Sequence, residues 1–133
     1  MLVKRFGVSL ESDLLEALDN LVDRKSLPNR SQAIRYLIRR NVVERKWDDN
    51  AEVAGSIVLV YHHDKRDHLI KTIQSTAGNL NLVLSLQHVH LNGGVCMETI
   101  AVRGNAKQLQ DMADELIAIK GMLHGELVMA AME

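Results

Sequence analysis

The sequence has one cysteine in 133 residues, so no disulfide can form within the chain. A lone thiol is typical of a reducing compartment, and we expect a cytoplasmic protein whose thiol is free to bind a metal. No apolar run approaches the roughly 18 residues that a membrane-spanning helix needs. No secretory signal peptide is expected, because Met1–Arg5 leads into no apolar segment. Aromatic residues make up only 3% of the chain, too few to form stacking platforms for single-stranded nucleic acid.

Catalytic patterns are missing as well. The chain shows no Gly-rich phosphate loop, no nucleophile paired with a base and no general-base carboxylate in a helical metal motif, so we do not expect an enzyme. What is present is the composition of a globular protein, with 47% hydrophobic and 25% charged residues.

The near-neutral net charge conceals an asymmetry between the two ends of the chain. Residues 1–47 contain ten Lys and Arg against six Asp and Glu, a net charge of +4, whereas the remaining residues contain six against eleven, a net charge of −5. A basic first third is typical of a segment that meets a polyanion such as DNA. The alternative is chance clustering of charges on solvated helix faces.

Residues 4–10 alternate as in a β-strand, with Arg5, Gly7 and Ser9 on the face opposite the apolar side chains. Two helices follow, one from Ser12 or Glu11 and one capped by Ser31 and ending near Trp47. A unit of about 45 residues cannot bury a sufficient core alone. We therefore expect two copies to pair their strands into an antiparallel ribbon, whose outward residues fit the DNA major groove.

The strand, the two helices and the stretch Asn29–Arg35 resemble the ribbon-helix-helix family of bacterial repressors. The resemblance implies that the outward strand residues read bases and that the second helix holds a phosphate at its N-terminus. The residues implied in DNA binding are Arg5, Gly7, Ser9, Asn29, Arg30 and Ser31.

Beyond Trp47 the pattern changes, and the sequence predicts an α+β protein of two parts. Residues 1–48 form the ribbon-helix-helix domain, 49–54 a polar linker and 55–133 a regulatory domain. In the last part, strands are expected at 56–61, 80–91, 95–102 and 122–129, and helices at 64–76 and from Gly104-Asn105 through Ile119. That order is βαββαβ, a ferredoxin-like arrangement with an antiparallel sheet and two helices on one side.

The segment His88-Val89-His90 is the strongest sign of a metal site. Side chains in a strand alternate between faces, so the two imidazoles share one face. If the Gly-containing loop that follows has an odd number of residues, Cys96 joins them across the hairpin. Such donors suit zinc, nickel or copper; the alternative is ordinary residues of a half-buried sheet. Glu98 shares the face, either supporting a ligand imidazole or simply solvated.

A ribbon-helix-helix unit joined to a βαββαβ domain with this His-x-His and Cys set resembles the nickel-responsive transcriptional regulators. The resemblance is supported by the segments Tyr61–Asp67 and Lys120–Gly125 and by Glu98. The resemblance implies repression at operator DNA, a tetrameric core of regulatory domains and square-planar nickel. It further implies that one subunit supplies two histidines and a cysteine and that its neighbour supplies another histidine. The metal ligands carried over to this chain are His88, His90 and Cys96.

The chain departs from that family at three positions. Ala77 stands where the neighbour's histidine is expected, and Gln32 and Tyr36 stand where an acidic pair is expected. Three donors predict weaker nickel binding than in four-ligand members, and DNA binding by the metal-free form. Zinc, or no metal, is the alternative cofactor, and a metal-independent ribbon-helix-helix regulator is the alternative function. The histidines that could complete the site are His62, His63, His68 and His124.

Overall fold

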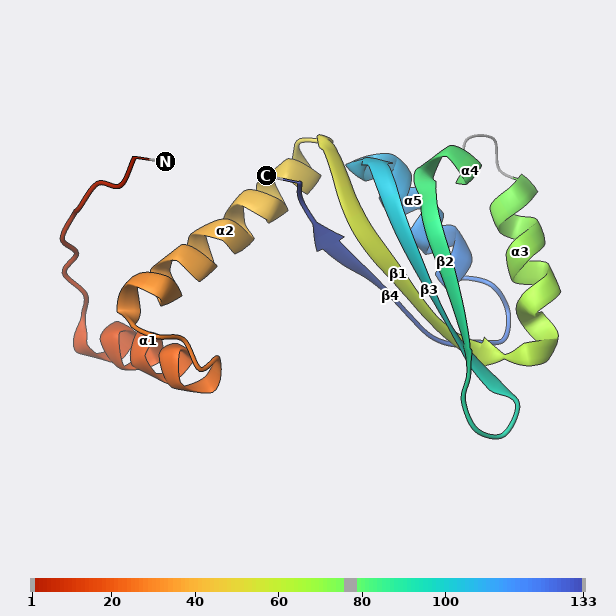
Figure 1. Ribbon diagram of the computed structural model, residues 1–133, viewed down its shortest axis with the longest axis horizontal. Helices are drawn as coiled ribbons and strands as arrows, with labels where there is room; N and C mark the ends of the chain where they lie inside the picture. The colour runs from red at the N-terminus through yellow and green to blue at the C-terminus, as the bar shows by residue number, and fades with distance from the viewer. Residues whose placement is uncertain (1, 76–78, 133) are drawn as a thin grey trace. The chain divides into compact units, whose positions relative to one another are not determined.

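The computed structural model describes residues 2–75 and 79–132 and divides the chain into two compact units, Met1–Asn41 and Val42–Glu133 (Figure 1). No helix among these residues is both long and apolar enough to cross a bilayer.

The first unit contains helix α1 (Ser12–Arg24) and the first part of helix α2 (Arg30–Asp48). The guanidinium of Arg30 joins the two helices by donating to both carboxylate oxygens of Asp19, at 2.8 and 3.0 Å. Helix α2 begins two residues earlier than predicted, with Asn29 in place of Ser31 as its cap. The Asn29 side-chain oxygen accepts from the backbone N–H of Gln32 at 3.0 Å, three residues into the helix, as a capping side chain does.

The predicted strand over residues 4–10 does not form within the single chain. Residues 2–11 have no regular secondary structure and are exposed throughout. The physical reason is that a strand requires a second strand to complete its hydrogen bonds.

The second unit is built on a four-stranded antiparallel sheet. Its strands are β1 (Glu52–His62), β2 (Val83–His90), β3 (Val95–Asn105) and β4 (Met122–Ala130), in the order β2-β3-β1-β4. A short 3₁₀ turn, η1 (His63–Lys65), leads from β1 into helix α3 (Arg66–Ser75). Helix α5 (Ala106–Ile117) packs against β1, β3 and β4 and contacts α3, so both helices cover one face of the sheet. The predicted βαββαβ order is confirmed.

Two details of this unit differ from the sequence prediction. A helical turn, α4 (Asn79–Leu82), occupies the first residues of the predicted second strand. The linker is also shorter than predicted. Strand β1 begins at Glu52, and Val53 is fully buried in the core. Trp47 belongs to the same core: it is 5% exposed, and its indole N–H donates to the carbonyl of Ala130 at 2.9 Å.

Candidate metal centre

The β2–β3 hairpin brings His90 and Cys96 face to face. The register pairs His90 with Cys96 and His88 with Glu98, so the loop has the odd number of residues that puts Cys96 on the face of the two histidines. Gly93 and Gly94 shape the turn at φ +68° and +77°, a left-handed conformation that costs glycine little. His88, His90 and Cys96 therefore lie together on the face that the helices cover.

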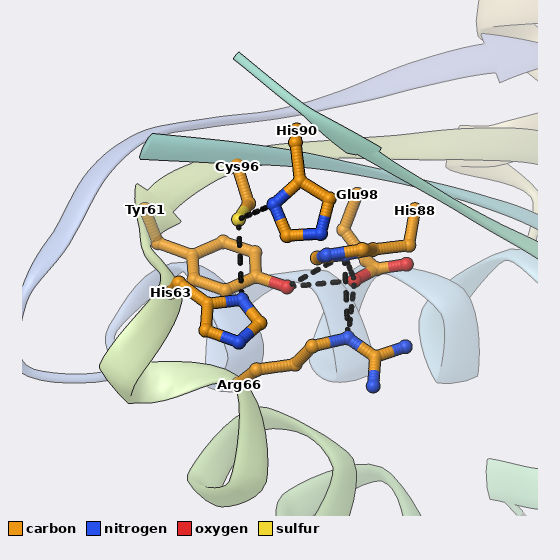
Figure 2. A network of polar contacts seen from close by, with 7 residues as sticks. All are labelled: Tyr61, His63, Arg66, His88, His90, Cys96 and Glu98. Carbon is orange, nitrogen blue, oxygen red and sulfur yellow. Dashed lines mark hydrogen bonds and ion pairs between the residues drawn. The ribbon is translucent and has the colours of Figure 1, made fainter. Parts of the chain in front are cut away.

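A fourth side chain, His63, joins them from the other side of Cys96 (Figure 2). Strand β1 pairs with β3 so that Tyr61 lies opposite Cys96, and η1 begins one residue after the strand ends. The backbone N–H of His63 then donates to the carbonyl of Gly94 at 2.8 Å. Of the four histidines left open by the sequence, only His63 belongs to the donor cluster found among the described residues.

The four donor atoms lie within 4.8 Å of one another. The Cys96 sulfur is 3.5 Å from Nδ1 of His63 and 3.6 Å from Nδ1 of His90. Cys96 is buried and His88 partly buried, whereas His63 and His90 are exposed. An ion could therefore enter from solvent on the side of the two exposed imidazoles.

A buried carboxylate supports this cluster from behind. Glu98 is fully buried, and its Oε1 accepts from the Tyr61 hydroxyl at 2.6 Å and contacts Nδ1 of His88 at 2.8 Å (Figure 2). The guanidinium of Arg66 lies 3.6 Å from the same oxygen and offsets its charge. A buried carboxylate needs such partners, because an unpaired buried charge is strongly destabilising. Of the two alternatives for Glu98, the solvated one is wrong: the carboxylate is buried and contacts the imidazole of His88.

The contact with Glu98 favours one tautomer of His88. An ionised carboxylate can only accept, so the 2.8 Å contact places the proton on Nδ1 of His88. The Nε–H of Arg66 also points at Nδ1, at 3.2 Å, and donates to it only in the tautomer that carries its proton on Nε2. The tautomer with the proton on Nδ1 keeps the shorter contact, the one to Glu98. The other ring nitrogen, Nε2, keeps its lone pair; it is buried and has no hydrogen-bond partner among the described residues.

Burial raises the pKa of Tyr61 well above its usual value, and the hydrogen bond to Glu98 raises it further. The phenol therefore remains protonated, and remains a donor to Glu98, throughout the physiological pH range.

The donor set fits a borderline divalent metal. Three imidazoles and one thiolate suit nickel, zinc or copper and not calcium or magnesium. An ion would also satisfy the buried Nε2 of His88, which is otherwise an isolated polar atom. Ala77, the position of the missing family ligand, lies outside the described residues.

The residues implied in DNA binding lie in the first unit. Arg5, Gly7 and Ser9 are all exposed on the segment before α1. Asn29 caps α2, Arg30 is held by Asp19 and Ser31 is exposed in the first turn of the helix. At the two positions where acidic residues were expected, Gln32 is partly buried and the Tyr36 hydroxyl accepts from Arg40 at 3.2 Å.

The two units and the donor cluster define a class of protein, a DNA-binding regulator with a metal-binding regulatory domain. The family described as "Ribbon-helix-helix protein, copG family" matches residues 4–45, and the family described as "NikR C terminal nickel binding domain" matches residues 54–130. The chain belongs to the nickel-responsive transcriptional regulators, which bind DNA through a ribbon-helix-helix domain and are not enzymes.

Relatives named as nickel-responsive regulators are similar over nearly the whole chain. The relative from Desulfovibrio desulfuricans is 46% identical over 91% of this chain and 88% of its own length. The relative from Geobacter sulfurreducens is 45% identical over 94% and 91%. That from Pyrococcus furiosus is 42% identical over 96% and 93%.

A solved structure shares the fold of the regulatory unit. It is the solution structure of the C-terminal domain of the MgtC protein from Mycobacterium tuberculosis, with a TM-score of 0.50 and 8% identity. The match covers 61% of this chain and 90% of that one, and at this identity it shows the fold alone.

Proposed function

We propose that this chain is a cytoplasmic repressor that binds operator DNA through a two-stranded ribbon and that responds to nickel held by His63, His88, His90 and Cys96. The observation that carries the proposal is the convergence of these four donors in a nickel-binding domain joined to a ribbon-helix-helix unit.

The first unit has an open apolar groove that a second copy of the same unit would fill. Phe6 and Val8 are 75% and 58% exposed, and they line the groove together with Leu10, Leu14 and Leu37. Large apolar side chains this exposed are a marker of an interaction surface. Pairing of two such segments would bury them and give each strand its missing hydrogen-bond partners. Arg5, Gly7 and Ser9 would then face outward, toward the major groove.

The regulatory unit offers a second contact surface, the sheet face that the helices leave uncovered. The register places Val58, Val60, Val89 and Met97 on that face, and none of the four is fully buried. Other copies of this unit would cover it, because an apolar sheet face must pack against another layer. The assembly that results is a tetramer, with regulatory units in the middle and a ribbon at each end. No membrane is involved in this scheme.

Metal binding in this site would join two elements of the regulatory unit. The hairpin supplies His88, His90 and Cys96, and η1 supplies His63. Glu98 orients the His88 ring, while Tyr61 and Arg66 stabilise the carboxylate. When bound, the ion supplies a four-way link that fixes the hairpin against the start of α3. Nickel can raise the affinity for DNA only if it binds the arrangement of the protein that is competent for DNA more tightly than the arrangement that is not.

Replacing Arg5 with alanine should weaken binding to a selected operator duplex by about 1–3 kcal/mol, because arginine can donate two hydrogen bonds to guanine. Discrimination against random duplex should fall as well. Quantitative gel shifts at fixed salt measure both quantities, using an operator selected by the protein from a random library. Arg103→Ala is the control, since Arg103 pairs with Glu52 in the regulatory unit at 3.3 Å. Unchanged affinity and discrimination in the Arg5 variant would exclude the ribbon as the reading surface.

A further inference from the structure

We propose that the metal centre is complete within one subunit, with His63 of the same chain as the fourth ligand and the four donors arranged tetrahedrally. The inference rests on the proposed metal-binding role of the cluster and goes beyond it: no neighbouring subunit contributes a ligand.

The backbone places His63 at the cluster. Strands β1 and β3 are paired along their whole length, and the pairing ends with His62 opposite Val95. The next residue, His63, is then tied to the hairpin by its own N–H, which donates to the carbonyl of Gly94. The position of the His63 backbone therefore follows from hydrogen bonds within one chain and needs no contact between subunits.

The two distances from the Cys96 sulfur match a tetrahedron better than a square plane. With a metal–sulfur bond of about 2.3 Å and metal–nitrogen bonds of about 2.0–2.1 Å, tetrahedral angles separate sulfur from nitrogen by about 3.5–3.6 Å. With the same bond lengths, a square plane separates neighbouring donors by about 3.1 Å and opposite donors by about 4.4 Å. The observed separations from the Cys96 sulfur are 3.5 Å for His63 and 3.6 Å for His90. Both agree with the tetrahedral values; other separations in the cluster reach 4.8 Å, so the donors would have to move closer together around an ion.

The third imidazole completes the set. This is the imidazole of His88. Its Nδ1 contacts Glu98, and its Nε2 is buried without a hydrogen-bond partner among the described residues. The His88 and His90 rings stand edge to face with centroids 4.8 Å apart, and the His63 ring is 5.2 Å from that of His90. Three rings thus surround the region beside the sulfur. Zinc would fit this arrangement as well as nickel, because tetrahedral sites with nitrogen and sulfur ligands are typical of zinc.

The test is a titration of the full-length, metal-free protein with Co²⁺, which reports tetrahedral thiolate coordination by intense visible bands and a thiolate charge-transfer band. The wild type should show both, with one ion per chain. His63→Ala should lose the tetrahedral bands and bind at least about 100-fold more weakly, the upper limit seen when a residue that merely supports a ligand is removed. His62→Ala is the matched control, because His62 is the adjacent exposed histidine and lies outside the cluster; it should bind like the wild type.

Nickel and mixed assemblies supply two further tests. The nickel complex should be paramagnetic, as tetrahedral nickel is, whereas a diamagnetic square-planar complex would overturn the proposed geometry. Co-assembly of His63→Ala with Cys96→Ser chains should restore no tetrahedral site. Recovery of the cobalt bands in the mixture would show that His63 serves a neighbour's site and would overturn the inference.

The failure of the inference can be told apart from failure of the proposed metal role. If Cys96→Ser abolishes Co²⁺ binding and His63→Ala leaves affinity and bands unchanged, the cluster is a metal site but His63 is not its ligand. If Cys96→Ser binds cobalt like the wild type, with the same bands, the cluster is not the metal site and both proposals fail.

Discussion

Replacing Phe6 with aspartate should lower specific operator affinity at least about 1,000-fold, to the level of non-specific binding. Phe6 is 75% exposed in the single chain and lines the apolar groove of the first unit. In the paired ribbon it would be buried, and a carboxylate there would be desolvated without a partner. Without pairing, no ribbon forms and Arg5 has no fixed direction toward the bases.

The control for this variant is Leu2→Asp. Leu2 is 85% exposed and is not among the residues that line the groove, so the change adds the same negative charge near the DNA without disturbing the ribbon. It should reduce affinity modestly and in a salt-dependent way. Light scattering should find four chains per assembly for both variants, held together by the regulatory units. Operator affinity of Phe6→Asp within tenfold of the wild type would refute the paired ribbon.

Replacing Glu98 with glutamine should lower nickel affinity by about 10–100-fold, the range observed when a residue that orients a metal-bound histidine is altered. Glutamine keeps the shape of the side chain and can still accept a hydrogen bond. It removes the negative charge of Glu98, which pairs with Arg66 and makes the His88 imidazole a more basic metal ligand. The position of His88 should therefore change little, while its affinity for the ion falls.

Competition with a chelator of known nickel affinity measures this effect. Glu126→Gln is the matched control, because Glu126 is an exposed carboxylate on β4, which β1 separates from the strand of Glu98, and it lies outside the network. The metal-free forms of both variants should unfold at similar temperatures to the wild type. An unchanged nickel affinity in Glu98→Gln would mean that the carboxylate is purely structural.

The hairpin part of the site could be predicted from the sequence because it depends only on local geometry. Alternation with period two puts His88 and His90 on one face, and the parity of the loop puts Cys96 opposite His90. The role of Glu98 could not be decided in the same way, since burial depends on what packs over the strand. In the folded chain Tyr61 and Arg66, both from other elements, contact the buried carboxylate of Glu98.

His63 was one of four candidates because its position depends on the pairing of β1 with β3, strands that are distant in sequence. A signal was available: in a βαββαβ sheet these two strands are antiparallel neighbours, so the end of one meets the start of the other. A histidine directly after the first strand should therefore lie near the start of the third, where Cys96 is. The three donors identified in the sequence predict weak nickel binding. With His63 as a fourth donor in the cluster, we expect a nickel affinity like that of four-ligand members of the family.

The first strand shows a different limit of prediction. Its alternation predicts one apolar and one polar face, yet residues 2–11 are not a strand in the single chain. In the dimer that we propose, the free energy that forms this strand comes from a second copy, which no single-chain pattern supplies. Trp47 was also placed incompletely. The sequence predicts it at the end of a helix of the DNA-binding domain, and in the structure it packs into the core of the regulatory unit.

The most direct test of the account is the operator affinity of the full-length wild type, measured at fixed salt with and without one nickel ion per subunit, alongside Cys96→Ser. The account predicts that nickel tightens wild-type binding at least tenfold, about 1.4 kcal/mol, and leaves the affinity of Cys96→Ser unchanged. Equal operator affinity of the wild type with and without nickel would contradict it.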